Sequence, residues 1–214
     1  MTVMLERPAM LERPTTIDVP DGSARFQALC RALLTMDVPD GFRAEIIGGN
    51  IVMSPWSKGY YHDIMDSIVD QLKPHAPMGH RVSYAPFLFA FPKQERGYGP
   101  DIHVASRSAF RTDKRYIDGE ALSLVAELTS ASTRDTDWDD KAPVYGKSGV
   151  PVYLLLDMQE NAMTVFWSPS SRGYTSRLTV PFGEKVHIPA PFDCELDTSE
   201  FEAAPEQDDH SQAG

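Results

Sequence analysis

The chain has 214 residues, of which 42% are hydrophobic and 24% charged, a balance that suits one folded domain with a sizeable core. It contains no run of about 18 apolar residues, and its first residues lack the apolar core of a secretory signal. We therefore expect a cytoplasmic protein without a membrane span. The formal net charge of −11 permits a nucleic-acid substrate but argues against tight, sequence-independent binding to nucleic acid.

The two ends of the chain differ in composition from the middle. Residues 1–20 repeat the pentapeptide MLERP, and the proline that ends each copy disfavours a continuous helix. From Asp193 onward eight acidic residues cluster, and removing their charges leaves about −3, so this segment is expected to be loosely attached. We expect a disordered N-terminal segment over 1–20, a folded domain over 21–200 and an acidic disordered tail over 201–214.

Helical and strand-like patterns alternate within the folded part. The expected elements are a helix over 23–36, strands over 43–47 and 50–54, a helix from Ser57 to Pro74, strands over 81–91, 101–106 and 123–128, a helix over 137–148, and strands over 151–157, 162–167 and 174–181. Asp21 or Ser23 would cap the first helix, Gly48-Gly49 is a hairpin turn signal, and Gly149 would end the third helix. Helices followed by a mixed sheet with one crossover helix predict an α+β or α/β domain.

Two acidic residues stand at the ends of expected strands. Asp101 begins one strand, and Glu127 ends another that is apolar enough to be buried on both faces. If the strands are neighbours, the two carboxylates lie about 5 Å apart. Like charges at that distance repel unless a cation lies between them, and oxygen ligands suit Mg²⁺ or Mn²⁺. A simpler role for Asp101, as a capping residue between loop and strand, stays open.

Lys141 lies on the next expected helix, fourteen residues after Glu127. A lysine beside a metal-bound water can orient or deprotonate it and offset charge on a pentavalent phosphate. Two carboxylates, a cation and a lysine suffice for phosphodiester hydrolysis. Two simpler interpretations compete with this one. In the first, Asp137 and Lys141, four residues apart, form a solvent-exposed ion pair. Glu127 could pair with any of three basic residues that follow it, Arg134, Lys141 or Lys147.

Several motifs, taken in order and spacing, resemble the Uma-two family of restriction-type endonucleases, in the PD-(D/E)XK nuclease superfamily. The matching positions are Glu45–Pro55, His62, Pro100-Asp101, Ala126–Thr133, Asp137, Lys141, Tyr145, Gly149–Pro151, Tyr153 and Asp157. The resemblance covers roughly residues 23 to 200. It implies a PD-(D/E)XK restriction-endonuclease-like core, a mixed sheet flanked by helices, with metal-dependent cleavage of DNA and a homodimer.

The resemblance also assigns roles to residues of this chain. The implied catalytic set is Asp101, Glu127, Lys141 and Glu45, with Asp101, Glu127 and Glu45 as ligands of Mg²⁺ or Mn²⁺ and with His62 and Asp137 as accessory positions. Thr129 stands where the usual Glu-x-Lys signature has its lysine, so the following helix must supply that amine. His62 could equally be a partly buried helix residue bonded to the backbone.

Other positions depart from the family pattern. Gly48 and Asn50 replace an aspartate and a glutamate of the first motif, which leaves Glu45 alone there. Proline is favourable only in the first turn of a helix, so Pro143 predicts a helix that starts near Lys141. Such a start would change the position of the Lys141 amine relative to the metal. These departures and the acidic charge favour a second hypothesis, a catalytically inactive nuclease-fold protein that acts as a binding or assembly module.

Overall fold

The computed structural model describes residues 17–201, so residues 1–16 and 202–214, which make up most of the two segments expected to be disordered, lie outside the described residues. The elements are α1 (Ala24–Thr35), β1 (Phe42–Ile47), β2 (Asn50–Pro55), α2 (Tyr61–Leu72), β3 (His80–Ser83), β4 (Phe89–Phe91), β5 (Arg96–Tyr98), β6 (Ile102–Ser106), β7 (Ile117–Asp118), β8 (Leu122–Leu128), α3 (Arg134–Thr136), the π-helical turn η5 (Asp137–Lys141), α4 (Ala142–Lys147), β9 (Val152–Asp157), β10 (Ala162–Ser170), β11 (Gly173–Pro181), β12 (Lys185–Ile188) and β13 (Cys194–Asp197). None of the helices in this described part is long and apolar enough to cross a membrane.

The larger sheet has the strand order β11-β10-β9-β8-β6-β3. Its strands β8 and β9 run parallel, and the other neighbours are antiparallel. A parallel pair needs a crossover connection, and α3, η5 and α4 supply it. Every residue of β8 and β9 is buried, which accounts for their continuous apolar sequence. The expected mixed sheet with one crossover helix is confirmed.

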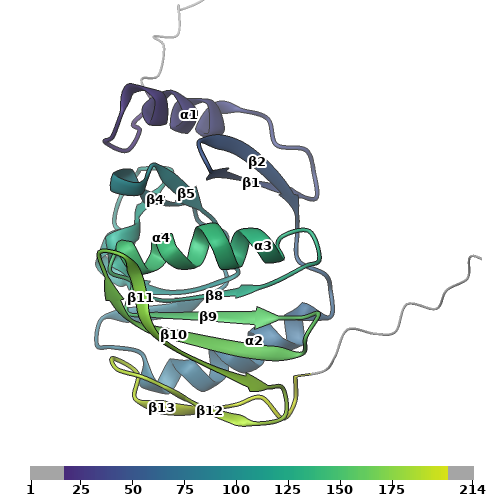
Figure 1. Cartoon of the computed structure of the whole chain (residues 1–214). Coiled ribbons are helices and arrows are strands. Elements are labelled where there is room, and N and C mark those ends of the chain that lie inside the picture. The colour runs from purple at the N-terminus through teal and green to yellow at the C-terminus, as the bar shows by residue number, and fades with distance from the viewer. Residues whose placement is uncertain (1–16, 202–214) are drawn as a thin grey trace, which may run out of the picture.

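Both faces of this sheet are covered (Figure 1). On one face, α2 packs with the β12–β13 hairpin around a core that includes Ile68, Leu124 and Leu154. On the other face, α4 packs around a second core, rich in aromatic rings, that includes Tyr145 and Tyr153. The smaller sheet, β2-β1-β5-β4-β7, lies beyond α3 and α4, with α1 outermost. The short link from β5 to β6 therefore joins the two sheets, and it carries Asp101.

Two residue patterns near the N-terminus form the structures that the sequence predicted for them, a helix cap and a hairpin turn. The side chain of Ser23 caps α1 by accepting a hydrogen bond from the Phe26 N–H at 3.1 Å. Gly48 and Gly49 connect β1 to β2 with φ angles of 58° and 74°. Both angles lie in the left-handed region that a two-residue hairpin turn requires and that glycine adopts without strain.

Two expectations about strands were wrong. Residues 81–91 form not one strand but β3 and β4, which belong to different sheets. Pro86 lies between them and has no N–H to give to a continuing ladder. The segment from Asp193 is not loosely attached either, because β13 pairs with β12 along its length. Its inward residues Cys194 and Leu196 are buried while Glu195 between them is exposed, an alternation that the acidic composition concealed.

Candidate active site

Asp101 and Glu127 lie on neighbouring antiparallel segments. Ile102 of β6 stands opposite Ala126 of β8, so Asp101 falls opposite the end of β8. There its Oδ2 accepts a hydrogen bond from the Leu128 N–H at 2.9 Å. The two acidic residues are 6% and 1% exposed, and a carboxylate so deeply buried is costly unless charge and hydrogen bonds compensate it. The pairing of β6 with β8 thus places both acidic residues at the same buried end of these two strands.

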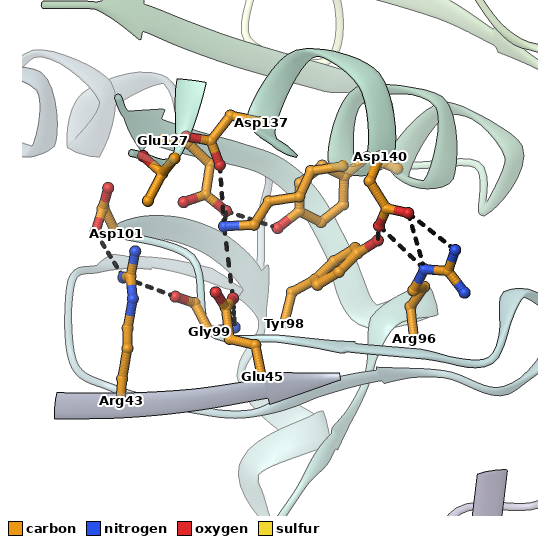
Figure 2. Close-up of polar contacts among 12 residues, drawn as sticks. Arg43, Glu45, Arg96, Tyr98, Gly99, Asp101, Glu127, Asp137 and Asp140 are labelled. Atoms are coloured by element: carbon orange, nitrogen blue, oxygen red, sulfur yellow. Dashed lines mark hydrogen bonds and ion pairs between the residues drawn. The ribbon is translucent and has the colours of Figure 1, made fainter. Parts of the chain in front are cut away.

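The amine of Lys141 contacts three carboxylates, those of Glu45, Glu127 and Asp137, which Figure 2 labels. Its Nζ is 3.0 Å from Oε1 of Glu127, 3.2 Å from Oδ1 of Asp137 and 3.5 Å from Oε1 of Glu45. The Lys141 side chain is only 2% exposed. The interpretation of Asp137 and Lys141 as a solvent-exposed ion pair is therefore wrong, because both residues are buried. Of the three basic residues considered as partners of Glu127, Lys141 makes the ion pair.

A π-helical turn positions this lysine. Over Asp137–Lys141 the helix widens, and the N–H of Ala142 donates to the carbonyl of Asp137, five residues earlier. Pro143 follows directly in the first turn of α4, where its missing N–H is tolerated because the hydrogen-bond ladder is already interrupted. The expectation that the helix begins near Lys141 was wrong: it begins at Arg134, and the wide turn directs Lys141 to the carboxylates.

Arg43, a residue that sequence reasoning missed, contacts Asp101. Its Nη1 lies 2.7 Å from Asp101 Oδ1 and 3.0 Å from the Gly99 carbonyl (Figure 2). The Ser57 hydroxyl donates to the same Asp101 oxygen at 2.9 Å. Arg43 precedes Glu45 by two positions in β1, so the two side chains project to the same face of the strand. That alternation was the available signal, an arginine beside the glutamate already considered.

Further hydrogen bonds hold the carboxylates in place. The Tyr145 hydroxyl donates to Glu127 Oε1 at 2.9 Å, and the Gly99 N–H donates to Glu45 Oε1 at 2.7 Å. The Lys141 amine lies over the ring of Tyr98, 5.8 Å from its centroid. The Tyr98 hydroxyl in turn bonds Asp140, which forms an ion pair with Arg96. The cluster is thus enclosed by groups that orient its oxygens.

The cluster has fewer positive than negative groups. Four acidic residues, Glu45, Asp101, Glu127 and Asp137, meet two cations, Arg43 and Lys141. Burial raises the pKa of Glu127 to about 8, although Lys141 acts to lower it. Burial also raises the pKa of Asp137. For Lys141, burial acts to lower the pKa, but the charges of Glu127, Glu45 and Asp137 outweigh it, so the pKa is raised and the amine stays protonated.

The donor chemistry of this cluster fits a divalent cation. Carboxylate oxygens are the hard ligands that Mg²⁺ and Mn²⁺ prefer, and four acidic side chains meet only two cationic side chains in this cluster. Across residues 17–201, no group of three or more His, Cys, Asp or Glu side chains is arranged as a metal site. Arg43 and Lys141 lie among the carboxylate oxygens in this arrangement and supply part of the missing positive charge.

The structure does not bring His62 into the cluster. It is exposed on α2, where its ring contacts Tyr84 and its Nδ1 lies 3.8 Å from an Asp66 oxygen. Asp157, another position of the resemblance, stabilises a turn outside the cluster. It pairs with Arg134 at 2.6 Å and accepts hydrogen bonds from the backbone N–H groups of the turn that follows β9.

Comparisons with known proteins bear on the family and the fold of this chain. The model of a family described as "Putative restriction endonuclease", Uma2, matches residues 24–199. A crystal structure described as "a putative nuclease belonging to DUF820" from Anabaena variabilis ATCC 29413 is similar with a TM-score of 0.55 and 20% identity, covering 75% of this chain and 88% of that chain. No curated protein matches this chain. The expected fold, a mixed α/β domain of the restriction-endonuclease-like type, is confirmed.

Proposed function

The chain belongs to the Uma2 family, and from that membership and its buried cluster we propose that it is a metal-dependent DNA endonuclease that hydrolyses phosphodiester bonds. The observation that carries the proposal is the position of the Lys141 amine. It lies between Glu127 and Glu45, at the end of β8 that Asp101 also contacts. A buried lysine among acidic residues is a costly arrangement for stability alone. Strongly perturbed ionisable groups gathered in this way are typical of functional sites.

The carboxylates of Glu45, Asp101 and Glu127 would hold one Mg²⁺ or Mn²⁺, with Asp137 beside them. When bound, such an ion lowers the pKa of a coordinated water and polarises a phosphate oxygen. Tyr145 and the Gly99 N–H keep two of these carboxylates oriented, which limits the rearrangement that binding requires. These contacts fix the orientation of Glu127 and Glu45, but the three carboxylates would still have to converge to hold an ion, because within residues 17–201 no such group is arranged as a metal site.

Lys141 and Arg43 supply the positive charge of the protein itself. The raised pKa of Lys141 keeps it an ammonium group, which can hold a water near the carboxylates and stabilise the charge that develops on phosphorus-bound oxygens. Arg43 lines a cleft together with Asp101 and is partly exposed there. Its guanidinium can bind a substrate phosphate entering that cleft. The two cations would thus contact the reacting group from two sides.

A cleavage assay with carboxylate variants tests this proposal. Plasmid and linear DNA are incubated with the protein and Mg²⁺ or Mn²⁺, and cleavage should fall at least about a hundredfold in Asp101→Asn and in Glu127→Gln. Circular dichroism and urea unfolding verify that both variants fold. Glu195→Gln, which removes a carboxylate that is 62% exposed on β13, should cleave like the parent protein. Unchanged cleavage by the two site variants would show the proposal to be wrong.

One observation favours the second candidate function, an inactive nuclease-fold protein used for binding or assembly. Arg43 already forms an ion pair with an oxygen of Asp101, and Lys141 forms one with Glu127, so both acids have partners without a metal ion. Calorimetric titration with Mg²⁺ and Mn²⁺ separates the two candidates. Binding that Asp101→Asn abolishes supports the nuclease, whereas no detectable binding at millimolar metal supports the inactive module. The homodimer that the resemblance implies stays a prediction, to be measured by sedimentation.

A further inference from the structure

A cleft of about 350 Å³ opens beside the cluster, and exposed aromatic rings line it. Its lining includes the polar residues Arg43, Ser57 and Asp101. The lining also includes Trp56, Tyr84 and Phe87, which are 49%, 44% and 41% exposed. Large aromatic side chains exposed together next to a polar site are unusual on a protein surface and mark a place for a ligand. Asp101 and these exposed aromatic rings therefore line the same cleft.

A second cleft, of about 420 Å³, continues from the first across Phe87. Two arginines line it, Arg81 of the edge strand β3 and Arg107, and no carboxylate is among its lining residues. Within the described part of the chain, neither arginine forms an ion pair, and Arg107 donates only to a backbone carbonyl, that of His80 at 3.2 Å. In a chain of net charge −11, two arginines without acidic partners form a local site for anions.

His103 gives an independent indication of a polar ligand in this second cleft. It lines the cleft yet is 1% exposed, and its ring packs among Phe87, Phe89 and Phe110. Its Nδ1 is buried without a hydrogen-bond partner. A buried polar atom rarely lacks a partner, and a bound ligand group would supply one.

Arginines and exposed aromatic rings together suit one class of ligand, an unpaired nucleic-acid strand. Each base of such a strand has two free faces that can stack on rings, and its phosphates can bind guanidinium groups. In a duplex the base faces are covered by their neighbours.

We propose that these adjoining clefts bind an unpaired segment of the substrate strand, with bases stacked on Trp56 and Phe87, phosphates on Arg81 and Arg107, and the strand leading to Asp101. The inference rests on the proposed nuclease function for the identity of the ligand. It adds a substrate class: single-stranded DNA, or the unpaired part of a branched or frayed duplex. The clefts position the strand, and the Lys141 cluster acts on it.

Fluorescence anisotropy with a labelled thymidine oligonucleotide of about 15 nucleotides tests the arginines. The titration is made in EDTA, so that no cleavage occurs, and is repeated with a duplex of the same length. We expect tighter binding of the single strand. The double variant Arg81→Ala/Arg107→Ala should bind it at least about tenfold more weakly and reduce the salt slope by about 1.4, the value for two phosphate contacts. Arg172→Ala, which removes an exposed arginine at the β10–β11 turn, should change neither quantity.

The aromatic part is tested in the same assay. Trp56→Ala and Phe87→Ala should each weaken binding of the single strand about fivefold or more without changing the salt slope. Leu178→Ala, which removes a side chain that is 46% exposed on β11, is the matched control and should have no effect. Equal or tighter binding of the duplex, or arginine variants with parental affinity and salt slope, would overturn the inference.

Three further outcomes separate this inference from others. If Trp56→Ala dissociates a dimer in sedimentation, the exposed rings form a subunit interface and the inference is wrong. If the oligonucleotide binds as expected but no DNA is cut with any metal, the proposed function fails while the binding surface stands. If the protein cuts duplex DNA and none of the cleft variants matters, the proposed function stands and the inference fails.

Discussion

The Lys141 amine lies 3.0 Å from the Glu127 carboxylate, and both side chains are almost fully buried, with exposed fractions of 2% and 1%. Neither residue would be stable in this position alone, since an unpaired charge in the interior costs several kcal/mol. The same pair joins the crossover helix to the central strand β8. Stability and the proposed chemistry therefore depend on one contact, and each can be measured separately.

Replacing the lysine should destabilise the fold strongly. Lys141→Met keeps most of the length of the side chain but leaves Glu127, Glu45 and Asp137 without their shared cation. We expect a loss of about 3–5 kcal/mol in the free energy of unfolding, measured in urea. The double variant Lys141→Met/Glu127→Gln should recover part of it. Lys185→Met, at a side chain that is 67% exposed, should cost less than about 1 kcal/mol. An equally small loss for Lys141→Met would contradict the buried cluster.

Stability should depend on pH through Glu127. Its pKa is about 8 in the folded protein against 4.5 for an ordinary glutamate, because burial disfavours the charged form. Between these values the folded state binds more protons than the unfolded chain, so stability falls as pH rises through that window, by about 1.4 kcal/mol for each unit of pKa difference.

Urea unfolding between about pH 5 and about pH 8 measures this dependence. Glu127→Gln cannot titrate and should show a flatter profile than the parent protein, with its largest gain at the alkaline end. Glu184→Gln, which removes an exposed carboxylate, should keep the parental profile. Parallel profiles for the parent and Glu127→Gln would mean that the Glu127 carboxyl titrates in its ordinary range.

Arg43 should oppose metal binding while supporting catalysis. Its guanidinium holds Asp101 at 2.7 Å, so a divalent cation at Asp101 meets a positive charge nearby. Arg43→Gln should bind Mn²⁺ about tenfold more tightly or better in calorimetry, because it removes one unit charge at short range. It should nevertheless cleave DNA more slowly, because a phosphate contact is lost. EDTA should reverse any Mn²⁺-dependent gain in melting temperature. Arg31→Gln, on the exposed side of α1, is the control.

Gly146 should not tolerate a side chain. A Cβ atom at this position of α4 would lie 2.6 Å from the Tyr174 nitrogen and 2.7 Å from the Gly173 carbonyl carbon, both backbone atoms of β11. Gly146→Ala should therefore cost about 1–3 kcal/mol of stability, since helix and sheet must move apart. Gly59→Ala, where the added Cβ meets no atom within 4 Å, is the matched control. Thermal unfolding of both variants checks this, and equal melting temperatures would contradict the packing.

Local sequence predicted most elements of the large sheet and the helices that cover it. The apolar runs of β8 and β9 indicate strands buried on both faces, and Gly48-Gly49 indicates the β1–β2 turn, because these signals act between neighbours in the chain. Asp101 and Glu127 could be singled out for the same reason, as charges at the ends of apolar strands. The β12–β13 hairpin was missed because its acidic outward residues resemble a solvated tail.

The sequence by itself therefore determined which residues could form a site: the strand-end acids Asp101 and Glu127 and the lysine of the crossover helix. Only the tertiary structure decided how they meet. Arg43 reaches Asp101 across 58 positions of the chain, because the β5–β6 link brings the small sheet against the large one. The widened turn before Pro143 decided where the Lys141 amine points. Such contacts arise from the packing of whole sheets and helices, which no local pattern specifies.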